Sequence, residues 1–247
     1  MLCLDIYNFL IILYMCYNPE TSALFFFIGI STSVYIYNYS PVIRNTQIHL
    51  LLLFYSLMEL LQTIQYYYVN KCENIINKIS TEIAYILVIF QPLVWNIFFY
   101  INSDKYEKYI FSTAIYLCLV WMIVNIFSRV SYKRINKPQN QEHSVFASDK
   151  VCTRKMNSHL YWTWTSAHLY ELNANYLMYL MLWFIPALTS SSQYYYALIV
   201  MFGGFIGALF GYTNNIDEIY YTFTASWCFI SIPIVLFVLL KMVYKKK

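Results

Sequence analysis

Long apolar runs recur along this chain and predict membrane-spanning helices. Seven runs approach the length of about 20 residues that a helix needs to cross a bilayer, and polar or charged turns separate several of them. No run alternates apolar and polar residues with a period of two, which argues against a β-barrel. The sequence therefore predicts an all-α polytopic membrane protein, a seven-transmembrane-helix bundle over residues 22–38, 48–69, 81–101, 109–128, 172–189, 193–213 and 222–242.

The segments outside these runs belong to the same single membrane domain, which covers residues 1–247. Residues 1–21 hold an apolar stretch that is too short to span a bilayer. They also lack the basic region and small-residue cleavage site of a signal peptide, so we expect an N-terminal interfacial extension. Residues 129–158 are polar and without periodicity, which predicts a mobile loop.

Composition agrees with a membrane protein. Hydrophobic residues make up 60% of the chain and charged residues 11%, against about 25% charged in an average soluble domain. The net charge of +4 comes mostly from one loop and the C-terminal tail, so we interpret it as a topology signal and expect no nucleic-acid partner. The expected partner is the lipid bilayer and the expected location is an integral, multi-pass one, in a membrane that the sequence does not identify.

Glu59 stands near the middle of the second predicted span. A carboxyl there costs about 2.5–3.5 kcal/mol on insertion scales, and such residues usually face the interior of a bundle. Ser56, Gln62 and Thr63 share its helical face. One interpretation is an interhelical hydrogen bond that fixes packing; the other is a polar pocket inside the bundle.

Other polar residues extend the pocket hypothesis. In the third span, Pro92 bends the helix and is flanked by amide side chains at the depth expected for Glu59. His159 and Trp162 lie three residues apart, so we expect them on one face of a helix. The hypothesis is a cavity open to the side that carries the loops 70–80, 129–158 and 214–221. Its catalytic candidates are Glu59, His159 and Glu218, and its other lining residues are Gln62, Gln91, Asn96 and Trp162.

Four cysteines are expected on that same side of the membrane: Cys16, Cys72, Cys152 and Cys228. They suit disulfides if that side is extracellular or lumenal, or metal ligands if it is cytosolic; inert membrane thiols are the third interpretation. The basic C-terminus favours a cytoplasmic tail and hence an external cysteine side. The sequence identifies neither a metal nor a cofactor.

Glycines concentrate in the sixth predicted span. Gly203, Gly207 and Gly211 follow one another at four-residue spacing, so one helix face carries no side chain. Such a face lets another backbone approach closely. The pattern predicts tight helix packing within the chain or a homo-oligomer formed through this span.

Several short motifs occur together in a recognisable order: Met15-Cys16-Tyr17, Ser56-Leu-Met-Glu59-Leu-Leu-Gln62, Cys72, Asn77, Thr81, Phe90-Gln-Pro92 with Asn96, Cys152, His159-Leu-Tyr-Trp162, Thr213-Asn-Asn with Glu218, and Trp227-Cys228 with Ser231. From Met15 onward the chain resembles an uncharacterised multi-pass membrane family, the domain-of-unknown-function proteins of large DNA viruses and microbes. Two departures from that pattern are Leu87, where the family has histidine, and a longer acidic loop after Asn215. The resemblance implies a seven-span fold and this residue set, without an activity.

Three functions compete for these residues. The first is a lipid-directed hydrolase or related membrane enzyme, in which acid, imidazole and amides supply acid–base or metal-assisted catalysis. The alternative is a channel, transporter or proton-coupled receptor that uses the buried acid as an ion or proton site. The second alternative is a structural or host-interaction protein of a viral membrane, in which the polar groups serve packing.

Overall fold

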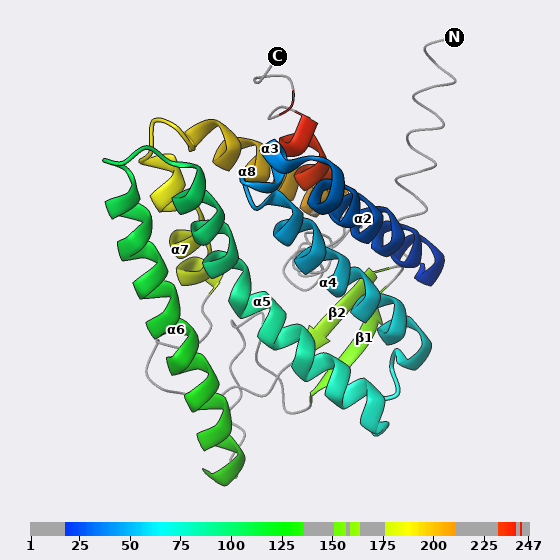
Figure 1. The fold of residues 1–247 in the computed structure, drawn as a ribbon. Helices are drawn as coiled ribbons and strands as arrows, with labels where there is room; N and C mark the ends of the chain where they lie inside the picture. Colours follow the sequence, from blue (N-terminus) through cyan, green and yellow to red (C-terminus); the bar gives the residue numbers. More distant parts are fainter. Residues whose placement is uncertain are drawn as a thin grey trace.

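The computed structural model describes residues 18–135, 151–156, 159–163, 176–210, 232–240 and 243. Within these ranges the side chains are described except at 128–135, 156, 159, 176 and 204–210. The described chain is mostly helical and carries one β-hairpin (Figure 1).

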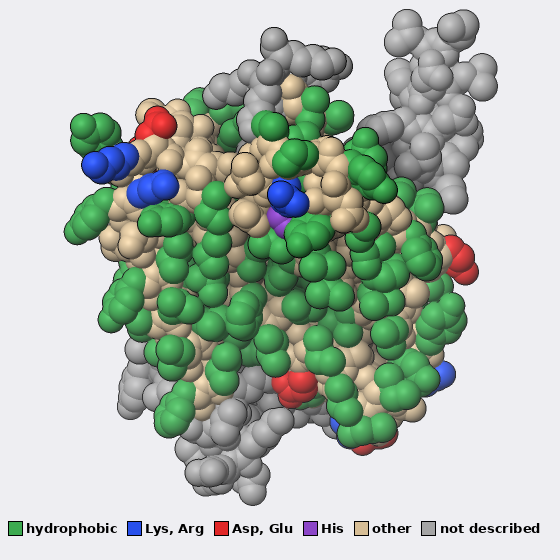
Figure 2. All heavy atoms as spheres, viewed as in Figure 1, with side chains coloured by type: hydrophobic (Ala, Val, Ile, Leu, Met, Phe, Trp, Pro, Cys, Tyr) green, Lys and Arg blue, Asp and Glu red, His purple; other side chains and the backbone are tan. Residues whose placement is uncertain are grey.

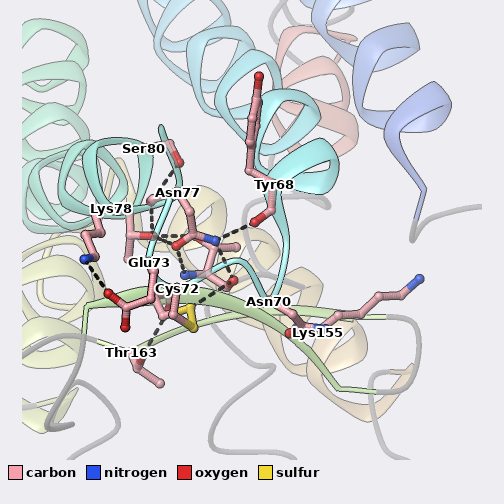
Figure 3. The surroundings of a disulfide bond; sticks show 12 residues. Tyr68, Asn70, Cys72, Glu73, Asn77, Lys78, Ser80, Lys155 and Thr163 are labelled. Carbon is pink, nitrogen blue, oxygen red and sulfur yellow. Dashed lines mark hydrogen bonds and ion pairs between the residues drawn. A yellow bond between two sulfur atoms is a disulfide. The ribbon is translucent and has the colours of Figure 1, made fainter. Parts of the chain in front are cut away.

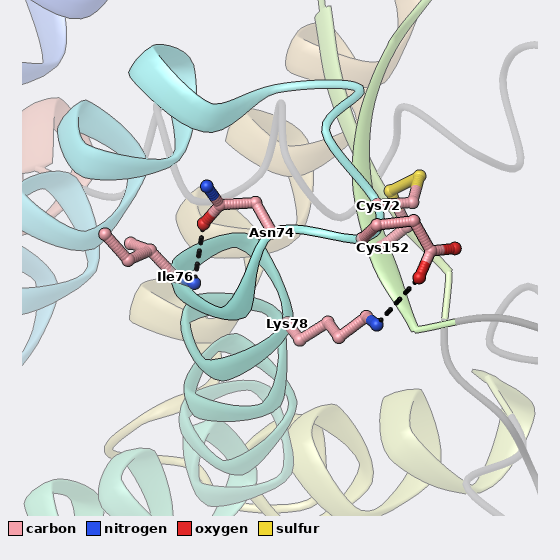
Figure 4. Close-up of polar contacts among 6 residues, drawn as sticks. Cys72, Asn74, Ile76, Lys78 and Cys152 are labelled. Carbon is pink, nitrogen blue, oxygen red and sulfur yellow. Dashed lines mark hydrogen bonds and ion pairs between the residues drawn. A yellow bond between two sulfur atoms is a disulfide. The ribbon is translucent and has the colours of Figure 1, made fainter.

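The first half of the chain is a series of helices joined by short turns. Its helices are α2 (Pro19–Tyr39), the single turn α3 (Pro41–Arg44), α4 (Ile48–Tyr68), α5 (Ile75–Asn102) and α6 (Lys108–Ile135). Asn18 caps α2, because its side-chain oxygen accepts a hydrogen bond from the Thr21 amide at 2.8 Å. Asn74 caps α5 in the same way through the Ile76 amide, also at 2.8 Å (Figure 4). These caps set where the two helices begin.

The second half contains the hairpin and shorter helices. β1 (Cys152–Met156) and β2 (His159–Thr163) pair antiparallel, with Cys152 opposite Thr163 and Met156 opposite His159. Helices α7 (Tyr176–Leu188) and α8 (Tyr194–Phe210) follow, and residues 232–240 are also helical.

Helix α5 is the centre of the arrangement. It contacts α4, α6, α7 and β1, whereas α2 packs on α4 and α8 packs on α7. In Figure 1 the hairpin lies near the turn between α4 and α5, and α3 and α8 lie toward the opposite end of the molecule. The first turns of α5 therefore lie near the hairpin, and its last turns lie toward the opposite end of the molecule.

Aromatic side chains fill the core where α4, α5 and α7 meet. Trp95 of α5 is buried; its ring nitrogen donates to the Tyr55 hydroxyl of α4 at 2.6 Å, and its ring lies 6.1 Å from that of Trp183 in α7. Pairing the indole N–H with a hydroxyl lets both large side chains be buried. This cluster joins the three helices at mid-height.

Apolar side chains also cover the outside of the molecule. Figure 2 shows hydrophobic side chains across the middle of one face, with charged side chains mostly toward its upper and lower rims. Exposed leucine and isoleucine side chains project from α4, α5 and α6, among them Leu50, Ile83 and Ile123. A surface of this kind suits contact with lipid.

Among the described residues, three helices are long and apolar enough to cross a membrane: Ile48–Tyr68, Ile75–Asn102 and Lys108–Phe127. Seven spans are not supported. Of the run predicted at 172–189, the 13 residues Tyr176–Leu188 form α7, and residues 172–175 are not among the described ones. Residues 211–231, which belong to the sixth and seventh predicted spans, lie outside the described part of the chain.

The region around His159 differs from the helix that its three-residue spacing predicted. Residues 159–163 form strand β2, and β1 occupies residues 152–156 of the predicted mobile loop, whose first residues continue α6 to Ile135. The physical reason is that β-branched and aromatic side chains such as Thr153, Tyr161 and Trp162 suit a half-buried strand. The helical interpretation of His159 and Trp162 is therefore wrong.

One asparagine compensates for a proline in the neighbouring helix. Pro186 lies inside α7 and has no amide hydrogen to donate to the Leu182 carbonyl four residues earlier. The Asn96 side-chain amide, from α5, donates to that carbonyl at 2.8 Å and to the Pro92 carbonyl at 2.8 Å. Asn96 thus replaces a missing helical hydrogen bond across the α5–α7 contact.

We expect Asn96→Ala to lower the free energy of unfolding by about 1–3 kcal/mol, because the buried Leu182 carbonyl would lose its donor. Thermal unfolding of the purified protein in detergent measures this loss. Pro186→Ala restores an amide hydrogen at position 186, so the same asparagine change should cost less in that background. Equal losses in the two backgrounds would show that Asn96 does not compensate for the proline.

Candidate functional site

Glu59 is completely buried in α4, at 0% exposure. The Ser22 hydroxyl of α2 faces its carboxyl, but neither carboxyl oxygen meets hydrogen-bond geometry with any described residue. The side-chain nitrogen of Gln62, one turn along α4, also has no partner within the described ranges. Buried polar groups are rarely left in this state, so an unpaired carboxyl and amide on one helix need an explanation.

Small residues let α2 lie close to this face of α4. A side-chain carbon added at Gly29 would come within 2.2 Å of the Ser56 hydroxyl oxygen, so only glycine fits there without a shift. Farther along, the Ser33 hydroxyl donates to the His49 carbonyl at 2.8 Å. The two helices run antiparallel with Ser22, Gly29 and Ser33 against α4, which places the Glu59 carboxyl at their interface.

The amides of α5 point elsewhere. Gln91 donates to the Met58 sulfur at 3.1 Å and accepts a short hydrogen bond from the Tyr179 hydroxyl of α7. Asn96 bonds to the α7 backbone, as described above. Gln91 and Asn96 are buried as expected, but in the described structure neither hydrogen-bonds to Glu59. Their contacts join helices, which matches the packing interpretation of these two residues.

The structure describes only part of the predicted catalytic set of Glu59, His159 and Glu218. His159 begins β2, but its side chain is outside the description, and Glu218 lies beyond the described residues. Cys16, Cys228 and Gly211 also lie there, while Gly203 and Gly207 belong to α8. The proposed meeting of Glu59, His159 and Glu218 therefore stays a prediction.

A second polar site ties the hairpin to the turn between α4 and α5. Cys72, in that turn, forms a disulfide with Cys152 of β1 (Figure 3). Beside it, the Asn77 side chain accepts from the Thr153 amide at 3.0 Å and donates to the Thr153 carbonyl at 2.9 Å. The asparagine amide thus pairs with β1 as another strand would. We call the disulfide and this pairing, with the two contacts described next, the clasp.

Two further contacts complete the clasp. The hydroxyls of Thr81 and Thr153 lie 2.7 Å apart, and the ring nitrogen of Trp162 donates to the Gln65 side-chain oxygen at 2.9 Å. Gln65 in turn donates to the Ser80 carbonyl at 2.9 Å. The sequence motifs singled out Asn77, Thr81 and Trp162, but nothing in the pattern identified Gln65 or Thr153 as their partners.

An ion pair lies next to the clasp. Lys78 and Glu73 are 3.1 Å apart on the surface beside the disulfide (Figure 4). Both side chains are largely exposed, so the pair contributes little to stability. The described residues contain no cluster of three or more histidine, cysteine or acidic side chains that would hold a metal, and the bonded pair Cys72–Cys152 is not a thiolate site.

Glu107 forms a third polar site at the opposite end of α5, which sequence reasoning missed. Its carboxylate accepts hydrogen bonds from the hydroxyls of Ser190 and Ser191, both at 2.8 Å, and from the Ser191 amide at 2.6 Å. The Ser192 hydroxyl and amide also donate to it. Burial, which raises the pKa of Glu107, is outweighed by the hydrogen bonds from Ser192, Ser190 and Ser191, which lower that pKa to about 2. This ion links the α5–α6 and α7–α8 turns.

Comparison with known proteins gives a family and no activity. The family described as "Family of unknown function (DUF5765)" matches residues 20–247. No curated protein matches the chain, and no solved structure matches it.

We expect the Glu107 contacts to be lost in acid. A carboxyl whose pKa is lowered from 4.5 to about 2 stabilises the fold fully above 4.5 and loses that contribution as pH falls through about 2. Thermal unfolding between these pH values should show the loss in the unmodified protein and a flatter pH dependence in Glu107→Gln. Glu73→Gln, at an exposed position, is the control and should keep the original dependence; the same slope in Glu107→Gln would contradict the assignment.

Proposed function

The chain belongs to the DUF5765 family, a family of unknown function, and we propose that it is a multi-pass membrane protein in which Glu59 binds a proton or a small cation. At least α4, α5 and α6 would cross the bilayer, in keeping with their length and apolar surfaces. The proposed class is a transporter or proton-coupled receptor.

One observation carries this proposal: the buried Glu59 carboxyl has no hydrogen-bond partner and no salt bridge among the described residues. An ionisable group inside a membrane segment is expensive, and it is usually retained for proton or ion chemistry. The unpaired Gln62 amide one turn away adds a donor to the two carboxyl acceptors. A proton or a small cation would satisfy the carboxyl oxygens, and a water molecule that accompanies it would accept a hydrogen bond from the Gln62 amide.

The other two hypotheses have less support. The lipid-directed hydrolase relies on His159 and Glu218, whose side chains are outside the described ranges, so no observed contact supports their meeting with Glu59. A purely structural role for Glu59 predicts hydrogen bonds from its carboxyl to neighbouring helices, as Asn96 makes. Neither carboxyl oxygen makes such a bond to a residue that the structure describes, which favours binding over packing.

The disulfide supports an orientation in the membrane. Disulfides persist in extracellular, lumenal or periplasmic compartments and are rare where thiols are kept reduced. The end that carries Cys72 and Cys152 is therefore proposed to face the oxidising side, and the turns holding Glu107 and Ser191 the cytoplasm. Basic residues occur at both ends, for example Lys71 and Lys105, so charge alone does not decide.

We expect Glu59→Gln to abolish proton uptake into vesicles that contain the purified protein. The amide keeps the shape of the side chain but does not gain or lose a charge by binding or releasing a proton at neutral pH. Uptake is measured with an enclosed pH-sensitive dye after a potassium gradient and valinomycin set the membrane potential. Empty vesicles give the background.

Glu20→Gln is the matched control, because Glu20 is an exposed carboxyl in the first turn of α2; its uptake should equal that of the unmodified protein. Equal uptake in Glu59→Gln and the unmodified protein would exclude Glu59 as the proton site. Release of fatty acid or headgroup from the vesicle lipid, dependent on Glu59, would instead support the hydrolase.

Orientation is tested with single cysteine substitutions at the two ends. In intact cells, Lys155→Cys in β1 should react with a membrane-impermeant maleimide. Tyr106→Cys, whose parent side chain is 93% exposed at the other end, should react only after permeabilisation. Peptide mass mapping separates these sites from the natural cysteines, and the reverse pattern would overturn the assignment.

A further inference from the structure

A row of polar side chains leads along α4 from Glu59 toward the hairpin. Glu59, Gln62 and Gln65 follow one another at three-residue steps, and all three are buried. At 1.5 Å of rise per residue, Gln65 lies about 9 Å along the helix from Glu59. The row therefore connects the carboxyl to the end of the molecule that holds the disulfide.

Trp162 covers the far end of this row. Its ring nitrogen donates to Gln65 at 2.9 Å, and it is 2% exposed while Gln65 is 0% exposed. Leu160, which lies on the same strand, is also buried. Strand β2 thus inserts two large side chains into the core at the point where the polar row would meet water.

The hairpin is held in this position by contacts with the α4–α5 turn. Asn77 and Thr81 bind Thr153 through hydrogen bonds, which can break and reform. The Cys72–Cys152 disulfide is the covalent contact, and it joins segments that are 80 residues apart in the sequence. Displacing the hairpin as a unit from α4 and α5 would require this bond to open.

We propose that the hairpin is a lid over the polar row that leads to Glu59, and that the Cys72–Cys152 disulfide is its latch. This inference rests on the proposed function of Glu59. With the latch closed, Trp162 separates the row from water on the disulfide side; with the latch open, the hairpin can move away and water or a cation reaches Gln62 and Glu59.

The latch opens by thiol–disulfide exchange with a dithiol reductant. Cys72 is partly exposed whereas Cys152 is buried, so a thiolate of the reductant attacks the Cys72 sulfur and Cys152 leaves as a thiolate that takes up a proton. The second thiol of the reductant then displaces Cys72, and the reductant leaves as a disulfide. Two electrons and two protons pass to the protein.

The test measures access to the middle of the row. Gln62→Cys places a thiol between Glu59 and the lid without altering either. Its rate of reaction with a charged, water-soluble methanethiosulfonate, added on the disulfide side, is compared in two backgrounds: the intact latch and Cys72→Ser/Cys152→Ser. We expect the rate to rise several-fold when the latch is absent, and to rise also after dithiothreitol treatment and desalting of the intact form.

Two controls and a second variant keep the result specific. Tyr106→Cys, at the opposite end, should react equally in both backgrounds, and neutral N-ethylmaleimide should reach Gln62→Cys in both. Should the double serine variant fail to fold, Trp162→Ala provides a second route, because it removes the side chain that covers the row while the disulfide stays intact; it too should increase the rate. An unchanged rate with the charged reagent in the opened form would overturn the lid. Because proton uptake depends on Glu59 and thiol labelling does not, the two proposals fail in different measurements.

Discussion

The constraint on which this structure depends is that polar groups inside an apolar molecule must find partners within the protein. Water is excluded from the core, and lipid offers no hydrogen bonds to the surface, so each unpaired group costs free energy. The Asn96 side-chain amide donates to a carbonyl that Pro186 leaves free. The Asn77 side-chain amide pairs with the edge of β1. Other buried polar atoms of the described chain also lack a partner, the Asn96 side-chain oxygen among them, but Glu59 is the only carboxyl in that group, which is why it is the functional candidate.

Helix α5 connects the sites at which polar groups find partners, because it contacts α4, α6, α7 and β1. Its first turns hold the clasp, its middle holds the aromatic core around Trp95, and the turn after it holds Glu107. The two ends use different chemistry: a covalent bond with neutral amides at one, and a carboxylate surrounded by serine donors at the other. Each chemistry suits the compartment proposed for its end, since the disulfide needs an oxidising side and the ion needs only water.

Sequence patterns were sufficient for the parts of the fold that depend on local periodicity. The apolar run for α4 ended within one residue of the observed helix, and the position of Glu59 within that run predicted its burial, but the other two runs began α5 six residues late and ended α6 seven residues early. The hairpin was missed because its stability comes from pairing with residues about 75 positions earlier, such as Asn77 with Thr153, which no local pattern reports. Glu107 was missed for the same reason: its serine partners follow α7, far along the chain.

The long separation between Cys72 and Cys152 has a consequence for biosynthesis. In the proposed orientation, the turn holding Cys72 reaches the oxidising compartment while β1 is still unsynthesised, since 80 residues separate the two cysteines. During that interval the Cys72 thiol stands unpaired, beside an Asn77 amide whose strand partner has not arrived. A cell that makes this protein must therefore protect an early thiol from premature pairing and deliver β1 to it only after α5 and α6 are in the membrane.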